Sequence, residues 1–122
     1  EQSGHIVIPQ VCTTGDGIAT GLLMMEQLAV TGRRLADLSA IMKVLPQELI
    51  NVRVADKHAV ACAPEVQAAV DAAEAELAGN GRVLLRPSGT EQLVRVMVEA
   101  GTADAALDTA QRIADVVAAA GA

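Results

Sequence analysis

The sequence predicts an α+β fold: a β-α-β-β-α unit with helices on one face of a largely antiparallel sheet, preceded by a partial α/β segment. Three observations lead to this prediction. Residues 93–99 alternate, with a valine at every second position. Apolar residues recur at helical spacing after Pro64 and again after Thr102. The 122-residue chain is 52% hydrophobic but has no aromatic residue, so its core must consist of small aliphatic side chains.

The first part of the chain is expected to form a short strand and two helices. Residues 5–9 contain an apolar run typical of a strand. Residues 13–17 offer capping side chains before a helical apolar stripe begins, and Gly32 ends that helix. A second helix is expected from Leu35 until Pro46 stops it.

A domain boundary is therefore expected near Pro46, which divides the chain into residues 1–46 and 47–122. Beyond it, residues 49–54 alternate between apolar and polar side chains, as a half-buried strand does. Pro64 is typical of the first position of a helix.

The last elements are two strands and a helix. The strands cover residues 82–86 and 93–99, and residues 87–92 connect them as a hairpin loop. Thr102 is the expected N-cap of the final helix. The apolar stripe of that helix is expected to comprise Leu107, Ala110, Ile113, Ala114 and Val117.

Composition excludes several classes of function. A formal net charge of −6 argues against nucleic acid as a partner, because phosphate backbones are bound by clustered Lys and Arg. No apolar run approaches the length of a membrane span, so no membrane partner is expected. Cys12 and Cys62 lie far apart in a sequence without a secretion signal, which predicts reduced thiols and a cytoplasmic location.

The loop between the two hairpin strands carries the strongest chemical signal. Arg86 offers a fork of N–H donors, Ser88 and Thr90 add hydroxyls, and Gly89 lets a ligand approach the backbone. Arg95 follows on the next strand and adds a second guanidinium. Together these groups fit a dianionic phosphate. The same pattern also fits a polar turn whose arginines form solvated surface ion pairs.

The opening segment is a second candidate site. Glu1, Ser3 and His5 place a carboxylate, a hydroxyl and an imidazole at alternating positions, which suits a ligand rich in hydroxyls such as a sugar. A polar chain terminus is the other interpretation. Because this dense segment comes first, without a lead-in, we expect the chain to be part of a longer protein.

Two other patterns are not interpreted as sites. Residues 15–21 resemble a dinucleotide-binding fingerprint, but the last glycine is one residue late and no β-α-β unit follows. His58 and Cys62 are four residues apart, yet no second pair of metal ligands stands near them. The sequence predicts no metal site.

Four segments in order resemble the α-D-phosphohexomutase family, and most closely its bacterial branch that acts on glucosamine phosphates. They are Glu1-Gln2-Ser3-Gly4-His5, Thr13-Thr14-Gly15-Asp16-Gly17, Arg86-Pro87-Ser88-Gly89-Thr90-Glu91 and Leu93-Val94-Arg95-Val96-Met97-Val98-Glu99. The resemblance covers essentially the whole chain. It implies the end of the third of four domains, followed by a complete fourth domain with a TATA-box-binding-protein-like fold.

The resemblance also implies an activity, the interconversion of glucosamine 6-phosphate and glucosamine 1-phosphate on the way to UDP-N-acetylglucosamine and cell-wall polymers. In the family a phosphoserine donates its phosphoryl group, and a bisphosphorylated intermediate reorients before the other phosphate returns to the serine. Glu1 and Ser3 would hold sugar hydroxyls, and His5 would line the same cleft. The residues implied for the non-reacting phosphate are Arg86, Ser88, Gly89, Thr90 and, as a weaker candidate, Arg95.

Two departures from the family pattern bear on function. Gln92 stands where the family usually has proline, which predicts a looser loop with one additional N–H. The phosphoserine loop and the aspartate-rich Mg²⁺ loop of the family have no counterpart in this sequence. The resemblance therefore implies that Mg²⁺ binds to a parent enzyme, whose remaining domains are the partners of this chain. It also implies that this chain alone does not catalyse the reaction. The alternatives are a stand-alone module that senses a small molecule and a pure interaction domain.

Overall fold

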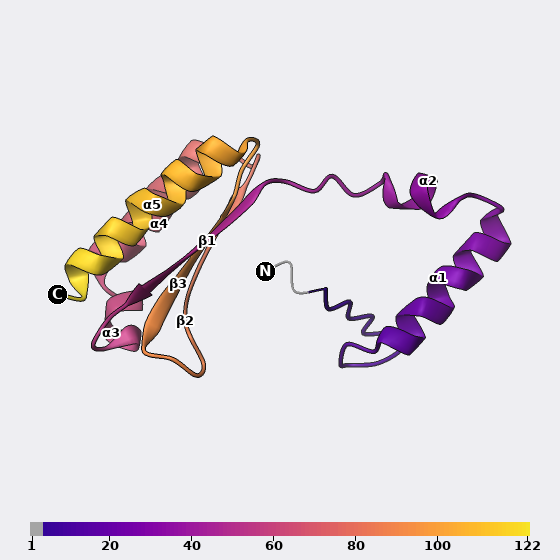
Figure 1. Ribbon diagram of the computed structural model, residues 1–122, viewed down its shortest axis with the longest axis horizontal. Coiled ribbons are helices and arrows are strands. Elements are labelled where there is room, and N and C mark those ends of the chain that lie inside the picture. Colours follow the sequence, from indigo (N-terminus) through magenta and orange to yellow (C-terminus); the bar gives the residue numbers. More distant parts are fainter. Residues whose placement is uncertain (1–3) are drawn as a thin grey trace. The chain divides into compact units, whose positions relative to one another are not determined.

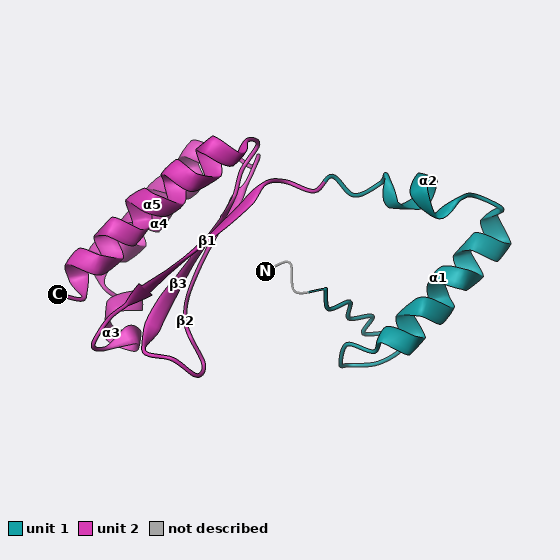
Figure 2. Ribbon diagram, viewed as in Figure 1, with its two compact units in different colours: residues 1–43 teal, residues 44–122 magenta. Residues whose placement is uncertain are grey.

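The computed structural model describes residues 4–122 and divides the chain into two compact units, residues 1–43 and 44–122 (Figure 2). The first unit contains the helices α1 (Gly17–Thr31) and α2 (Leu35–Ser39). The second unit contains three strands and three helices in the order β1, α3, α4, β2, β3, α5 (Figure 1).

The second unit is built on an antiparallel sheet with the strand order β1-β3-β2. Its strands are β1 (Gln47–Arg53), β2 (Arg82–Pro87) and β3 (Leu93–Glu99), so β3 pairs with both neighbours. The predicted α+β fold with a largely antiparallel sheet is thereby confirmed. Strands β2 and β3 are adjacent in sequence and form the expected hairpin, whereas β1 is separated from β3 in sequence by α3, α4 and β2.

Helices cover one face of this sheet (Figure 1). They are α3 (Lys57–Ala61), α4 (Pro64–Leu77) and α5 (Ala103–Ala120). Val94, Val96 and Val98 of β3 are completely buried in the core that these helices share with the sheet. Complete burial of a valine side chain stabilises a fold by roughly 2 kcal/mol. The alternation predicted for residues 93–99 therefore places three completely buried valines in the core of this unit.

The starts of α4 and α5 follow the expected chemistry. Thr102 caps α5, because its hydroxyl oxygen accepts a hydrogen bond from the Ala105 N–H at 3.2 Å. Helix α4 starts at Pro64 as predicted. It ends at Leu77, and its C-cap Ala78 adopts the left-handed conformation (φ 48°).

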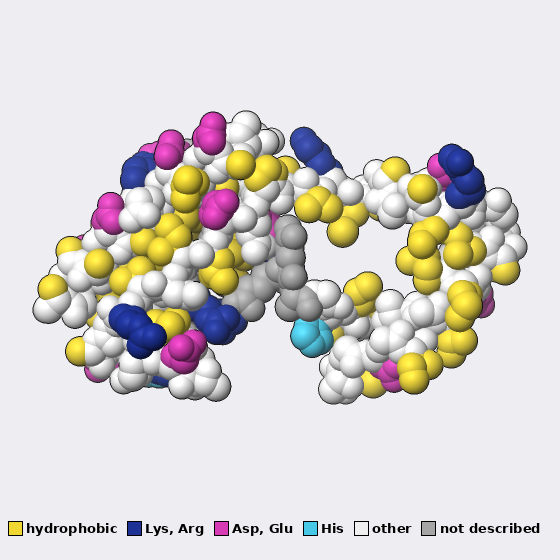
Figure 3. Space-filling view, viewed as in Figure 1, with side chains coloured by type: hydrophobic (Ala, Val, Ile, Leu, Met, Phe, Trp, Pro, Cys, Tyr) yellow, Lys and Arg dark blue, Asp and Glu magenta, His cyan; other side chains and the backbone are white. Residues whose placement is uncertain are grey.

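The first unit has no buried residue in either helix, and α1 leaves apolar side chains such as Ile18 and Val30 more than 70% exposed. Figure 3 shows hydrophobic side chains along this part of the chain. Asp16 caps α1 and Gly32 ends it with a positive φ of 62°, both within the predicted bounds. No helix in the part of the chain that the structure describes is long and apolar enough to cross a membrane.

Three expectations about secondary structure and packing are wrong. Residues 5–9 form no strand, because a strand needs a hydrogen-bonded neighbour and residues 4–43 contain none. Helix α2 ends at Ser39, well before Pro46, since the following Ile41 is 86% exposed and packing stabilises short helices. Leu107 is 48% exposed, because it lies at the edge of the buried stripe of α5 and Ala106 is buried in its place.

The turn into β2 gives a test of the packing. A Cβ at Gly81 would overlap the backbone carbonyl oxygen of Glu99, whereas a Cβ at Gly101 would meet nothing within 4 Å. We expect Gly81→Ala to lower the free energy of unfolding by about 1–3 kcal/mol. Urea denaturation of both variants is the measurement. Since both replacements restrict the unfolded chain alike, Gly101→Ala is the control, and equal midpoints for the two variants would refute the packing argument.

Candidate functional site

The loop between β2 and β3 is closed by bonds of its own. The Ser88 N–H donates to the Leu93 carbonyl oxygen at 2.9 Å, just beyond the last ladder pair of the hairpin. The Ser88 hydroxyl oxygen accepts from the Glu91 N–H at 3.4 Å, and Ser88 is 2% exposed. Ser88 thus shapes the loop in this structure. Its predicted contact with a phosphate stays a prediction.

The tip of the loop is open. Gly89 and Thr90 are both exposed, and a Cβ at Gly89 would meet nothing within 4 Å. A ligand can therefore approach the backbone of Gly89 without displacing a side chain. The hydroxyl of Thr90 lies at the same exposed tip.

The ladder register sets the two arginines of the candidate site side by side. Arg86 of β2 is paired directly with Arg95 of β3, and Asn51 of β1 is paired with Arg95 on the other side. Directly paired residues project from the same face, and this face is opposite to the one that carries the buried valines. Arg86 and Arg95 are each half-buried. Figure 3 shows Lys and Arg side chains gathered near the end of the sheet where β2 and β3 connect.

Two further residues hold the loop, and no spacing in the sequence indicates the contact of either. Lys57, the first residue of α3, donates to the carbonyl oxygens of Ser88 at 2.6 Å and of Glu91 at 3.1 Å. Gln92 donates from its side-chain amide to the Ala55 carbonyl oxygen at 3.3 Å. Where the sequence suggested that Gln92 loosens the loop, its side chain instead ties the loop to the segment before α3.

The first unit holds the other predicted site only in part. His5 is exposed and lines a shallow cavity of about 150 Å³ together with Gly15 and Asp16. Glu1 and Ser3 lie outside the described residues. Their predicted contacts with sugar hydroxyls stay predictions.

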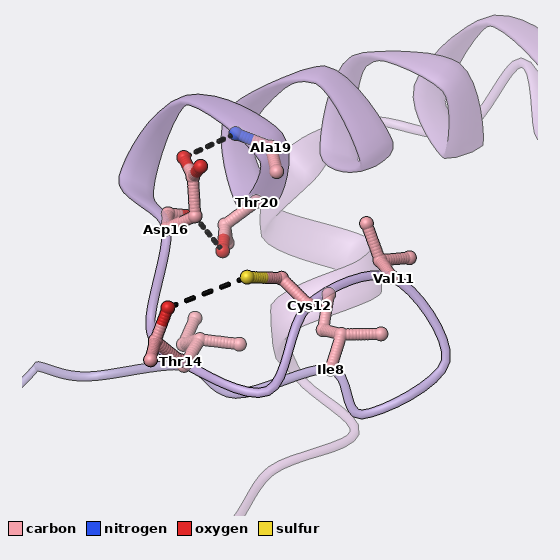
Figure 4. A pocket seen from close by; sticks show the side chains of 8 residues that line it. Ile8, Val11, Cys12, Thr14, Asp16, Ala19 and Thr20 are labelled. Carbon is pink, nitrogen blue, oxygen red and sulfur yellow. Dashed lines mark hydrogen bonds between the residues drawn. The ribbon is translucent and has the colours of Figure 1, made fainter.

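A second pocket lies beside the start of α1 (Figure 4). Asp16 accepts from the Ala19 N–H at 2.9 Å, and the Thr20 hydroxyl donates to the Asp16 carbonyl oxygen at 2.7 Å. Cys12 and Thr14 share a hydrogen bond of 3.3 Å, which lowers the pKa of the Cys12 thiol. These hydrogen bonds show that the glycine-rich segment 15–21 contains the N-cap and the first turn of α1.

Residues 4–122 do not bring a set of metal ligands together. Among residues 4–122, no three His, Cys, Asp or Glu side chains are placed to hold a metal ion. His58 and Cys62 lie at the two ends of the short helix α3, and Asp56 caps that helix through the N–H groups of His58 and Ala59. Cys12 and Cys62 are free thiols.

Comparison with known proteins assigns both units to one family. The family model described as phosphoglucomutase/phosphomannomutase, C-terminal domain, matches residues 49–116. The model described as phosphoglucomutase/phosphomannomutase, alpha/beta/alpha domain III, matches residues 1–45. The chain belongs to the phosphoglucomutase/phosphomannomutase family.

Within that family, the chain is similar to phosphoglucosamine mutases. It is 63% identical over 119 residues to the phosphoglucosamine mutase of Mycolicibacterium gilvum, covering 98% of this chain and 27% of that protein. It is 62% identical over 117 residues to the phosphoglucosamine mutase of Salinispora tropica, covering 96% of this chain and 26% of that protein. The chain thus spans about a quarter of the length of these curated relatives.

A solved structure shows the same fold. The chain superimposes with a TM-score of 0.74 and 34% identity on the Aspergillus fumigatus N-acetylphosphoglucosamine mutase in complex with GlcNAc-6P and magnesium. The match covers 90% of this chain and 22% of the fungal chain. The family resemblance of the four sequence segments is thereby confirmed.

An ion pair between Arg82 and Glu99 lies on the sheet face that carries Arg86 and Arg95, at the other end of the strands. It makes a contribution to stability that should depend on pH. The Arg82 Nε donates to the Glu99 carboxylate at 2.7 Å, and this hydrogen bond lowers the pKa of Glu99 from its usual 4.5. A lowered folded-state pKa contributes stability above the unfolded-state pKa and loses it as the pH falls. We expect Glu99→Gln to cost up to about 1 kcal/mol at pH 7, and this cost to shrink as the pH falls below about 4.5.

Urea unfolding between pH 7 and pH 3 measures this difference. The control is the same replacement in an Arg82→Met background, where the pH dependence should be much weaker because the partner is absent. A cost that stays constant over the whole range would contradict the assignment of the effect to this pair.

Proposed function

We propose that this chain supplies the phosphate-binding loop and part of the sugar-binding surface of a phosphoglucosamine mutase, which interconverts glucosamine 6-phosphate and glucosamine 1-phosphate. The observation that carries the proposal is the register that sets Arg86 opposite Arg95, beside the open tip at Gly89. The similarity to relatives of that name supports the choice of substrate.

The chemistry of the loop suits a phosphate that does not react. Two guanidinium groups side by side on one sheet face offer a dianion two cationic partners. Guanidinium groups bind phosphate oxygens with two parallel hydrogen bonds, which fixes orientation as well as position. A substrate that binds in two orientations needs such a fixed cradle, because binding energy gained there positions the reacting end elsewhere.

In this proposal the sugar is held by Glu1, Ser3 and His5. A carboxylate, a hydroxyl and an imidazole supply both donors and acceptors, as sugar hydroxyls require. The exposed position of His5 and the cavity beside it are compatible with this role.

Catalysis requires groups that residues 4–122 do not bring together. Mg²⁺ prefers several oxygen ligands in an octahedral arrangement, and the described residues include no cluster of three possible ligands. Under the proposal, the Mg²⁺ and the phosphoserine belong to the remaining domains of a longer cytoplasmic enzyme on the route to UDP-N-acetylglucosamine and peptidoglycan. The 122-residue chain alone then binds the phosphosugar without isomerising it.

The coding sequence that precedes Glu1 tests the parent enzyme. We expect it to encode a loop with a serine nucleophile and an aspartate-rich loop for Mg²⁺, because phosphoryl transfer needs a nucleophile and a counterion for the phosphate charge. Sequencing the gene is the measurement. A start codon immediately before Glu1 contradicts the proposal and favours a stand-alone module that senses a small molecule.

A binding experiment tests the loop. We expect glucosamine 6-phosphate to shift the amide resonances of residues 88–90 first in an NMR titration of the 122-residue chain. Arg86→Ala should weaken binding at least about tenfold, since charge-assisted hydrogen bonds contribute about 1.5–3 kcal/mol each. Arg112→Ala removes the same charge from the helical side, where Arg112 pairs with Glu76, and is the control.

Two results would count against this loop as a phosphate site. One is an unresponsive loop at millimolar ligand. The other is an Arg86→Ala variant that unfolds, because Arg86 would then serve the fold and its effect on binding would be indirect.

A further inference from the structure

Lys57 joins the candidate phosphate loop to a helix far away in sequence. The carboxylate of Asp56 accepts from the N–H groups of His58 and Ala59 at 3.1 and 3.0 Å, which fixes the start of α3. From there the Lys57 ammonium reaches the carbonyl oxygens of Ser88 and Glu91, 31 and 34 residues away. These carbonyls belong to the first and last residues of the turn 88–91. The Lys57 ammonium thus bridges the two ends of the turn, on the side of the turn that faces α3.

This contact decides which way the tip of the loop presents its donors. A trans peptide is planar, and its C=O and N–H point in opposite directions. The Ser88 carbonyl points at Lys57, so the N–H of Gly89 in the same peptide points away from Lys57. No hydrogen bond between residues 4–122 uses that N–H, and the space around Gly89 is open. The donor therefore points away from Lys57 at the exposed tip of the loop.

We propose that Lys57 is a positioning residue of the phosphate loop: its ammonium holds the Ser88 and Glu91 carbonyls on the side that faces α3, so that the Gly89 N–H faces the bound phosphate. Lys57 itself need not contact the ligand. Without its ammonium, the peptide between Ser88 and Gly89 is free to rotate, and a rotated peptide presents a carbonyl oxygen to the anion. One donor is then lost and one repulsive dipole is gained.

This inference rests on the proposed function, and the chain offers a matched control for it. Lys43 is the only other lysine, and it is exposed. We would titrate the ¹⁵N-labelled 122-residue chain with glucosamine 6-phosphate and follow the Gly89 amide. Lys57→Met should raise Kd about tenfold, a loss of about 1.4 kcal/mol, whereas Lys43→Met should leave Kd unchanged. Lys57→Arg should recover part of the affinity, because a guanidinium also donates to two carbonyls.

A spectroscopic signature separates positioning from a general loss of structure. In the ligand-free Lys57→Met protein, the Gly89 amide should shift or broaden while the amides of β3 keep their wild-type positions. In the wild-type chain, the ammonium protons of Lys57 should exchange with water more slowly than those of Lys43. This comparison needs no variant, so it tests the bonds on which the proposal depends even where Lys57→Met does not fold.

The outcomes distinguish the two proposals. If the wild-type loop binds the phosphosugar and Lys57→Met binds it equally well, the positioning role of Lys57 is overturned and the phosphate site stands. Equally fast exchange of the two ammonium groups also overturns the positioning role. If the wild-type loop does not respond to the phosphosugar, the phosphate site itself fails, and the role of Lys57 in it fails too.

Discussion

Burial of Val94, Val96 and Val98 beneath the helices fixes the register of the whole sheet in residues 44–122. Side chains alternate along a strand, so a slip of one residue would bring Arg95 into the core and expose the valines. A guanidinium without a partner in an apolar core is far more costly than the loss of one valine contact. The apolar force that builds the core therefore also places Arg95 on the opposite face, directly beside Arg86.

The face opposite the helices carries a gradient of charge along the strands. At one end Glu99 is paired with Arg82, so that row is nearly neutral. The next row is apolar, with Met97 between Leu84 and Leu49. The row after that holds the two arginines of the candidate site and leads into the loop that Lys57 braces. An acidic chain with a net charge of −6 thus concentrates positive charge at one end of one sheet face.

Periodicity and caps predicted the elements whose signals are local. Valines at every second position, a proline at a first helical turn and a threonine cap each act within a few residues, and Thr102 and Pro64 are where the structure needs them. Features that depend on distant partners were missed. The apolar run 5–9 has the composition of a strand but no neighbour in residues 4–43. The bonds from Lys57 to the loop cross more than 30 residues, and no spacing in the sequence indicates them.

The candidate site depends on the same distinction between local and distant contacts. The candidate residues Arg86, Ser88, Gly89 and Thr90 lie at the end of β2 and in the loop that follows it, so their grouping follows from the hairpin alone. The conformation of the loop does not follow from the hairpin alone. It depends on the Lys57 ammonium of α3 and on the hydrogen bond from the Gln92 side-chain amide to Ala55. The second unit contains all of these contacts and a buried core, whereas neither helix of the first unit buries a residue. Ligand binding by the 122-residue chain is therefore expected to report chiefly on the proposed phosphate loop, because the proposed sugar-binding segment belongs to the unit whose helices bury no residue.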